Sequence, residues 1–371
     1  MIYKQFHNLK LSALGLGCMR LPQLKENEQI DIPALKEMVA YAIKNGVNYF
    51  DTAWGYHGGN SEPVMGQVLS AYPRESYHLA TKFPGYIAEN LENKEDIFQQ
   101  QLNRCRVEYF DFYLCHTVSE SNIDQYLDPK YGFVEFLLEQ KKLGRIQHLG
   151  FSTHGSLETT ERFLDAWGGQ MEFCQVQLNW LDWDLQDAKA KVQMLNDRNI
   201  PIWVMEPLRG GSLCQLSSTQ EERLKQLRPD HRIPQWSFRF LQGTPGVTMI
   251  LSGMSNFQQV QENIETLSEN KPLNSEETQA LFAIAREITA KNTLACTNCR
   301  YCVEFCPKEL NIPGLIKLYN KHVYDGSTIE ADELGEEKHP GSCVVCGACT
   351  KVCPQQIKIP QMMADLAKQL P

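Results

Sequence analysis

The 371-residue chain has no run of about eighteen apolar residues, the length that a helix needs to cross a bilayer. It also lacks a run rich in lysine and arginine, and its formal net charge is -9. Nucleic-acid partners require a basic face, so nucleic acid is not expected. LSALGLGCM at 11–19 lacks a signal-peptide cleavage site and reads as a strand. These absences predict a soluble, cytoplasmic protein with no membrane or nucleic-acid partner.

The cysteines are numerous, but their distribution argues against a disulfide framework. Of the thirteen, eight are bunched near the C-terminus and the others stand singly. Without a secretory signal, tightly spaced cysteines are typical of thiolates that bind metal in a reducing cytoplasm. The single ones are expected to be small core residues. They are Cys18, Cys105, Cys115, Cys174 and Cys214.

Helix-period and strand-period segments alternate along the first 270 residues. LKEMVAYAIKNG at 35–46 keeps its apolar residues on one face and stops at Gly46, as an amphipathic helix does. Strands are expected at 11–19, 47–51, 77–82, 110–116, 146–153, 173–178, 201–208 and 246–254. Helices are expected at 35–46, 61–71, 94–106, 132–143, 156–166, 186–198, 216–227 and 256–267.

Eight strands, each followed by a helix, predict an α/β fold with a closed (β/α)8 TIM barrel. The open, doubly wound alternative would need a G-x-G-x-x-G turn after the first strand, and none is present. The pattern changes near residue 271. We therefore expect a barrel domain at 1–270, a linker helix at 271–292 and a small cysteine-rich domain at 293–371.

Two cysteine runs of the same form dominate that last domain. CTNCRYCVEFCP at 296–307 and CVVCGACTKVCP at 343–354 each hold three cysteines two residues apart, then a fourth before proline. Three thiolates at this spacing can wrap one face of an iron-sulfur cube. Zinc is the alternative, but it prefers two C-x2-C pairs per tetrahedral site. A disulfide framework fits less well.

The tail closely resembles the two-cluster bacterial ferredoxins. In that family the fourth cysteine of each run binds the other cluster, so the resemblance implies two [4Fe-4S] clusters with crossed ligands. One ligand set is Cys296, Cys299, Cys302 and Cys353, and the other is Cys343, Cys346, Cys349 and Cys306. Clusters pass single electrons, so we expect the tail to conduct electrons within the protein or to exchange them with a partner. A purely structural role of the clusters is the alternative.

Polar residues at the carboxyl ends of barrel strands are the expected reactive groups. Asp51, Lys82 and His116 end three successive strands, and Tyr56 follows on the first loop. A tyrosine can protonate a carbonyl oxygen as hydride arrives if its pKa is lowered, which the Lys82 ammonium would favour. Asp51 would hold Lys82 charged, and His116 would polarise the carbonyl or relay the proton. The alternative is a set of buried polar residues that only close the barrel.

Over roughly residues 1–270 the sequence resembles the aldo-keto reductases, through D-T-A-x-x-Y, S-E-x-x-x-G, T-K and L-x-H. With its tail, the whole chain looks like the iron-sulfur-bearing branch of that family. The resemblance implies a catalytic tetrad on Asp51, Tyr56, Lys82 and His116. It also implies reversible reduction of a small-molecule carbonyl, or oxidation of an alcohol, with NAD or NADP.

The same resemblance suggests the contacts to the nicotinamide cofactor. They are Ser152, Gln175, Pro207, Leu208, Gly210, Ser255, Gln259, Glu262 and Asn263. The segment 251–264 matches the family's phosphate and adenosine loop, with a helix N-terminus facing the phosphates. Thr153 replaces the usual asparagine and Met205 the usual stacking aromatic residue. Since 253–259 holds no basic residue, the sequence does not decide between NAD and NADP.

The two parts of the chain handle electrons differently. Hydride carries two electrons and a cluster one, so coupling ordinarily needs a flavin, for which the sequence shows no motif. Three arrangements are open: stepwise electron delivery to the substrate, a flavin in the barrel, or a tail that serves docking and stability. An external carrier, ferredoxin or flavodoxin, is a candidate partner. In a different class of function, the barrel is catalytically silent and the chain is an electron-transfer or assembly component.

Overall fold

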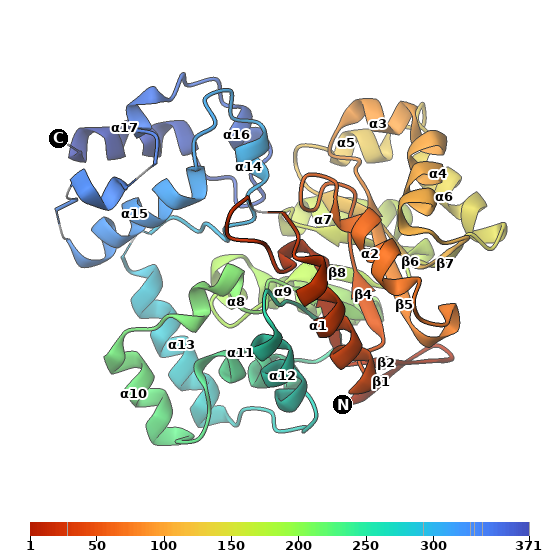
Figure 1. Ribbon diagram of the computed structural model, residues 1–371, viewed down its shortest axis with the longest axis horizontal. Helices are drawn as coiled ribbons and strands as arrows, with labels where there is room; N and C mark the ends of the chain where they lie inside the picture. The colour runs from red at the N-terminus through yellow and green to blue at the C-terminus, as the bar shows by residue number, and fades with distance from the viewer. Residues whose placement is uncertain (28, 292, 327, 330, 336, 371) are drawn as a thin grey trace. The chain divides into compact units, whose positions relative to one another are not determined.

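A computed structural model describes residues 1–371 except 28, 292, 327, 330, 336 and 371 (Figure 1). The chain forms two compact units. The first comprises Met1–Leu208 and Arg228–Ser275, and the second Arg209–Leu227 and Glu276–Pro371. Two separate stretches of sequence therefore build the second unit. Among the described residues, no helix is both long and apolar enough to cross a membrane.

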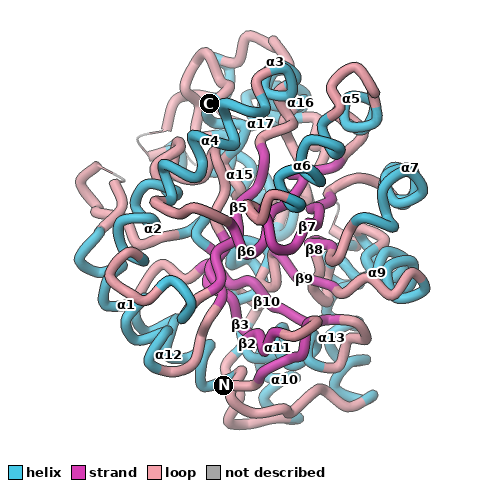
Figure 2. The backbone as a smooth tube through the Cα atoms, turned by 90° about the vertical axis from the view of Figure 1, so that its right-hand side faces the viewer, coloured by secondary structure: helices cyan, strands magenta, loops and turns pink. Residues whose placement is uncertain are grey.

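The first unit is built around a closed barrel of eight parallel strands, as predicted (Figure 2). Their order around the barrel is β10-β3-β4-β5-β6-β7-β8-β9. The strands are β3 (Leu14–Gly17), β4 (Tyr49–Asp51), β5 (His78–Phe83), β6 (Phe110–Val118), β7 (Ile146–Thr153), β8 (Cys174–Gln177), β9 (Ile202–Met205) and β10 (Val247–Gly253). β10 pairs with both β9 and β3, which closes the sheet on itself.

The segment predicted as one strand at 11–19 is divided in the structure. Its first part belongs to β2 (Leu9–Ser12), which pairs antiparallel with β1 (Tyr3–Phe6), and its second part is the barrel strand β3. Phe6 packs edge-on against Trp203 at 5.0 Å between ring centroids. Because Trp203 lies near the start of β9, the β1-β2 hairpin covers the amino-terminal end of the barrel, opposite the strand ends that carry the candidate site.

Seven of the predicted helices surround the barrel. They are α1 (Ile32–Lys44), α2 (Ser61–Leu69), α4 (Lys94–Cys105), α6 (Phe133–Lys142), α7 (Leu157–Trp167), α9 (Ala188–Asp197) and α12 (Phe257–Thr266). The prediction missed the short helices α3 (Ala88–Glu92), α5 (Ile123–Leu127) and α8 (Asp182–Leu185) in the loops.

The eighth helix of the barrel is not the one that the sequence predicted. The helix expected at 216–227 is α10 (Ser218–Leu227), which belongs to the second unit. The helix that packs against β10 is instead α11 (Ile233–Gln242). It was missed because Trp236, Phe238 and Phe240 recur with the period of a strand, and every residue from 236 to 241 is buried.

The second unit holds the cysteine-rich tail. Besides α10, its helices are α13 (Ser275–Thr289), α14 (Tyr301–Glu304), α15 (Ile312–Asp325), α16 (Ala348–Lys351) and α17 (Ile359–Gln369). Arg223 of α10 forms an ion pair with Glu287 of α13 at 2.6 Å, and the two helices lie side by side (Figure 1). A core that includes Leu310, Ile316 and Leu366 packs beneath the cysteines.

This tail repeats itself over a longer stretch than the cysteine runs. The cysteines recur 47 positions apart, as Cys296 and Cys343 do, and α14 and α16 begin at the same offset, as do α15 and α17. The left-handed backbone positions recur as well: Asn298 with Val345, Arg300 with Gly347, and Glu309 with Gln356. The tail is thus two copies of one loop-and-helix unit.

Helices α2 and α4 approach each other closely at Gly66. A Cβ atom on this residue would lie 2.6 Å from the Arg104 carbonyl oxygen and from the Cys105 carbonyl carbon. These are backbone atoms of α4, which cannot rotate away as a flexible side chain can. The glycine of the S-E-x-x-x-G pattern is therefore explained by helix packing.

We predict that Gly66→Ala lowers the free energy of unfolding by about 1–3 kcal/mol, because the new methyl group forces the two helices apart. Urea unfolding of the whole chain measures this. Gly169→Ala is the matched control, since nothing lies within 4 Å of its added Cβ. Equal stability of the two variants would show that the contact between α2 and α4 is less tight than described.

Candidate functional site

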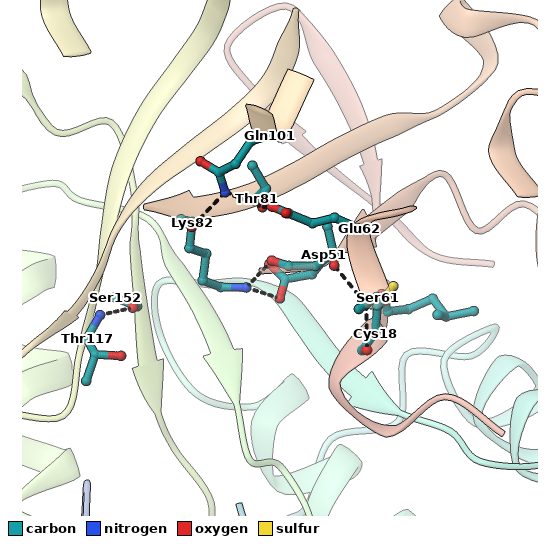
Figure 3. Close-up of polar contacts among 11 residues, drawn as sticks. Cys18, Asp51, Ser61, Glu62, Thr81, Lys82, Gln101, Thr117 and Ser152 are labelled. Atoms are coloured by element: carbon teal, nitrogen blue, oxygen red, sulfur yellow. Dashed lines mark hydrogen bonds and ion pairs between the residues drawn. The ribbon is translucent and has the colours of Figure 1, made fainter. Parts of the chain in front are cut away.

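Three successive strand ends bring the predicted polar residues together. Lys82 Nζ donates to Asp51 Oδ1 at 2.5 Å and to the Thr52 carbonyl oxygen at 2.8 Å (Figure 3). The ammonium lies 4.9 Å from the centroid of the Tyr56 ring. The Tyr56 and His116 rings are 6.1 Å apart and meet edge to face. The four side chains are buried and form one cluster.

The electrostatics of Tyr56 differ from the prediction. Burial raises the pKa of its phenol well above the ordinary value, and the nearby Asp51 carboxylate raises it further. The expected lowering of this pKa by Lys82 is therefore wrong for the chain described here. The sequence shows which charges are near but not how completely the phenol is withdrawn from water. At neutral pH the phenol keeps its proton and can donate it.

The other two titratable members of the cluster are also governed by burial. Burial raises the pKa of the Asp51 carboxyl, and the Lys82 charge opposes this. Burial, together with the same ammonium, lowers the pKa of His116 well below its ordinary value, so its imidazole is neutral at pH 7. Its Nδ1 is buried with no hydrogen-bond partner in the described part of the chain. A neutral imidazole with a spare nitrogen suits contact with a carbonyl group.

A buried network behind Lys82 fixes the end of β5. Glu62 Oε1 accepts hydrogen bonds from Thr81 Oγ1 at 2.6 Å and Gln101 Nε2 at 2.7 Å (Figure 3). Gln101 Nε2 also donates to the Lys82 carbonyl oxygen at 3.0 Å. Tyr113 in turn donates to Gln101 Oε1. The Glu of the S-E-x-x-x-G pattern therefore orients the backbone that carries the lysine.

Arg104 of α4 holds the loop that carries Tyr56. Its Nη2 donates to the carbonyl oxygens of Trp54, at 3.3 Å, and Gly59, on either side of the tyrosine. Its guanidinium stacks on the Trp54 ring at 4.2 Å, and its Nε lies 3.2 Å from Glu62 Oε2. The sequence analysis missed this residue because it lies about fifty positions from the loop and in no recognised motif.

The backbone after His116 is strained. Thr117 has a φ of 57°, a left-handed conformation that β-branched residues rarely adopt. Three hydrogen bonds hold this segment: Thr117 N donates to Ser152 Oγ at 2.8 Å, Asn122 Nδ2 to the Thr117 carbonyl at 2.7 Å, and Tyr126 to the His116 carbonyl at 2.7 Å. Strain that the surroundings maintain is common at functional sites, and here it sets the direction of His116.

Two predicted cofactor contacts lie beside this cluster. Ser152, the last but one residue of β7, is paired with Gln175, the second residue of β8. Gln175 Oε1 is buried and, within the described residues, accepts no hydrogen bond, so it fits an amide N–H of a ligand. Thr153 is instead engaged within the protein, since its hydroxyl donates to the Val118 carbonyl.

The next three predicted cofactor contacts follow β9 in the sequence, and they do not all belong to the same unit. Pro207 and Leu208 close the first stretch of the first unit, and Pro207 is buried. Gly210 belongs to the second unit and has a φ of 65°. The backbone of this glycine is thus one that a larger residue would strain.

The predicted phosphate loop precedes α12. Asn256 caps this helix by accepting from Gln259 N, and Gln259 Oε1 accepts from Ser255 N at 2.8 Å. Asn263 donates to Ser252 Oγ at 3.1 Å. The Glu262 carboxylate lies 3.8 Å from Arg232 and accepts a hydrogen bond from Gln258 Nε2 at 2.8 Å, and its role as a cofactor contact stays a prediction.

A basic residue that the sequence analysis did not connect with this loop lies next to it. The Arg20 carbonyl accepts from Ser255 Oγ at 3.0 Å, and the Arg20 side chain packs within 3.0 Å of the position of a Cβ on Gly253. Arg20 is more than 230 positions away in the chain, so no local pattern could have revealed it. The loop region therefore has beside it a cation that its own sequence lacks, and its guanidinium lies 3.6 Å from the Glu206 carboxylate.

The eight tail cysteines line two separate cavities. One cavity is bordered by Cys306, Cys343, Cys346 and Cys349. A second cavity is bordered by Cys296, Cys299, Cys302 and Cys353. In each case the fourth cysteine comes from the other run.

The spacing of these thiols does not suit a single zinc ion. Zn–S bonds of about 2.3 Å would hold four sulfurs close together. Among the described residues, the one group of three or more His, Cys, Asp or Glu ligand atoms mutually within 4.8 Å is His7, His148 and Glu172. Among the described residues, no three of the tail thiols therefore lie within that distance of one another.

Comparisons with known families agree with the fold and the tail. Residues 13–286 match the model of the aldo/keto reductase family, and residues 295–357 match that of a 4Fe-4S dicluster domain. "Probable aldo-keto reductase 1" of Glycine max is 27% identical over 215 residues, 54% of this chain and 57% of that protein. The chain thus spans just over half the length of that relative.

Two further similarities cover more of the barrel. The NADH-specific methylglyoxal reductase of Escherichia coli is 25% identical over 308 residues, 71% of this chain and 92% of that enzyme. A solved aldo-keto reductase of Klebsiella pneumoniae, in complex with NADP and acetate, matches with a TM-score of 0.59 at 21% identity, covering 76% of this chain and 93% of that one. Since the reductase model spans most of the sequence, the chain belongs to the aldo/keto reductase family, as an oxidoreductase that carries an additional 4Fe-4S dicluster domain.

Proposed function

We propose that this oxidoreductase reduces a small-molecule carbonyl, or oxidises the corresponding alcohol, at Asp51, Tyr56, Lys82 and His116, and that it exchanges electrons through two [4Fe-4S] clusters. The observation that carries the proposal is the buried Lys82 ammonium, 2.5 Å from the Asp51 carboxylate and 4.9 Å from the Tyr56 ring. The functional division that we propose is a reductase barrel at 1–270, a linker helix at 271–292 and an iron-sulfur domain at 293–371.

Each residue of the cluster has a separate task in this proposal. Tyr56 protonates the carbonyl oxygen as hydride reaches the carbonyl carbon, which leaves a phenolate. The Lys82 ammonium stabilises that phenolate, and Asp51 keeps Lys82 charged and oriented. Neutral His116 contacts the carbonyl oxygen and fixes its position. In the oxidation of an alcohol, the same groups act in the reverse order.

A nicotinamide dinucleotide is the proposed source of hydride, which its reduced ring supplies when bound. Gln175 Oε1, buried and unpaired within the described chain, supports an amide contact beside the cluster. Ser152 is its neighbour, and the Ser255 loop with Arg20 and the start of α12 supports phosphate binding. One relative is named for NADH and one solved neighbour holds NADP, so both cofactors are candidates.

The tail cysteines are the proposed ligands of the clusters, which supply one-electron exchange when bound. The cavity with Cys306 among the second-run cysteines and the cavity with Cys353 among the first-run cysteines support the crossed arrangement. Burial raises the pKa of several of these thiols, including Cys302 and Cys353, so their deprotonation is coupled to metal binding.

We predict that Tyr56→Phe lowers kcat for NADPH- or NADH-dependent reduction of an aldehyde panel by at least about 100-fold, since a general acid contributes roughly that much. Iron content and thermal midpoint should not change. Tyr131→Phe, on the loop before α6, is the matched control. A Tyr56→Phe enzyme within twofold of the wild type would refute its role as proton donor.

We predict that Arg104→Lys lowers kcat about tenfold with little loss of stability. The lysine keeps a positive charge near Glu62, but it cannot stack on Trp54 and hold both loop carbonyls as the planar guanidinium does. Steady-state kinetics and thermal unfolding measure the two effects. If kcat and stability fall in parallel, Arg104 is a structural residue rather than one that positions Tyr56.

The crossed ligand sets predict a particular pattern of iron loss. The anaerobically purified chain should hold about eight iron and eight sulfide, as expected for two four-iron clusters. The double variant Cys296→Ser/Cys353→Ser should retain about four iron, because both changes affect one cluster. Cys296→Ser/Cys306→Ser should lose both clusters. The reverse pattern would show uncrossed ligands, and zinc without acid-labile sulfide would exclude clusters.

A further inference from the structure

The second cysteine run contains an apolar residue in a strained conformation. Val345 has a φ of 56°, and its counterpart in the repeat, Asn298, has a φ of 54°. Asparagine tolerates the left-handed region, whereas a β-branched side chain there is strained. The fold of the loop therefore does not explain the valine, since asparagine serves the same backbone in the first copy.

The exposure of this loop also differs between the two copies. Val345 is 69% exposed and Val344 is 52% exposed, whereas Thr297, the counterpart of Val344, is 3% exposed. The polar residue of the pair is thus buried and the apolar one faces solvent. This is the opposite of what solvation alone would favour.

Val344 and Val345 belong to a larger apolar surface. Phe305 is 39% exposed, and Cys346 is the exposed member of the tail cysteines. We call these four residues, Phe305, Val344, Val345 and Cys346, the CVVC face. Phe305, Val344 and Cys346 border the cavity that Cys306, Cys343 and Cys349 also line. The face therefore lies at the rim of one proposed cluster site.

The charge at this rim contrasts with that of the chain. The formal net charge of the protein is -9, yet Lys308 is the one charged residue among the described residues that border the cavity. The adjacent Glu309 is in an ion pair with Lys338 at 2.8 Å. A partner that approaches this rim meets an apolar surface with Lys308 beside it, and the exposed Glu304 precedes Phe305 in the sequence, so Lys308 is the group that an acidic protein would contact.

The small area of the CVVC face indicates what kind of partner it can bind. Four exposed residues form a patch smaller than a stable dimer interface requires, but weak electron-transfer encounters use small interfaces. Exposed apolar residues at scattered sites, such as Leu143 at 61%, have no such neighbours and need no partner. An apolar centre with a charged edge also resembles the usual anatomy of a transient interface.

We propose that the CVVC face is the docking surface for a small acidic one-electron carrier protein. The proposal rests on the proposed function in one respect, namely that the cavity beneath the face holds a cluster. The strained Val345 is kept for its contact with the carrier, and Lys308 guides the carrier to the face. The equivalent loop at Asn298 serves the fold alone.

The experiment titrates the anaerobically purified full chain with flavodoxin as the acidic probe and measures Kd by isothermal titration calorimetry. Val345→Asn should raise Kd at least tenfold, and its thermal midpoint should not fall, because asparagine fits the left-handed position. Lys308→Glu should raise Kd and flatten its dependence on salt. Leu143→Asn, which changes an equally exposed apolar residue elsewhere, should bind as the wild type does.

The proposal is overturned if iron-loaded wild type does not bind flavodoxin, or if Val345→Asn and Lys308→Glu bind it as the wild type does. It is also overturned if the chain dimerises and Val345→Asn abolishes the dimer, since a second copy then covers the face. Iron content and carbonyl reduction are measured on the same samples. A wild type that lacks iron or does not reduce carbonyls counts against the proposed function. A wild type with normal iron content and normal carbonyl reduction that does not bind flavodoxin counts against the docking surface alone.

Discussion

The buried ion pair between Lys82 and Asp51 is the interaction on which the proposed chemistry of the barrel depends. Both side chains are almost inaccessible to water, and their nearest atoms are 2.5 Å apart. Charges in such a place persist only when they are paired, and removal of one partner of a buried pair typically costs about 3–5 kcal/mol. The pair therefore requires that β4 and β5 end next to each other, as their parallel register provides. The Thr52 carbonyl oxygen and the Tyr56 ring also lie against that ammonium.

Much of this arrangement could be predicted from the sequence, because it follows from repeated local patterns. Eight strand-helix units imply closure, and parallel strands in a barrel carry their carboxyl ends to one side, which brings Asp51, Lys82 and His116 together. What could not be predicted depends on contacts between distant segments. Arg104 reaches the Tyr56 loop from another helix, Arg20 reaches the Ser255 loop from the start of the chain, and the raised pKa of Tyr56 reflects burial that no motif records. Helix α11 was not predicted because its aromatic residues recur at every second position, which is the period of a strand.

The tail is organised differently from the barrel, since it is built from a repeated unit. Two copies of one loop-and-helix unit, offset by 47 positions, enclose two cavities, and each cavity takes its fourth cysteine from the other copy. This exchange makes the two copies depend on each other. The copies differ mainly in the loop between the first two cysteines, where one has a threonine and an asparagine and the other two exposed valines. The two copies of the unit thus differ in the side chains that this loop exposes.

The chain combines a proposed site for hydride, which moves two electrons, with a proposed tail site for single electrons. Central to this combination is that the carbonyl carbon receives hydride directly at the Lys82–Tyr56–Asp51 cluster. The most direct test is a single turnover of the iron-loaded chain with NADPH deuterated at both positions of C4, followed by mass spectrometry of the alcohol product. The account predicts one deuterium on the carbinol carbon in the wild type and a rate at least about 100-fold lower in Lys82→Met with its iron retained. An alcohol without deuterium, or an unchanged rate in Lys82→Met, would contradict it.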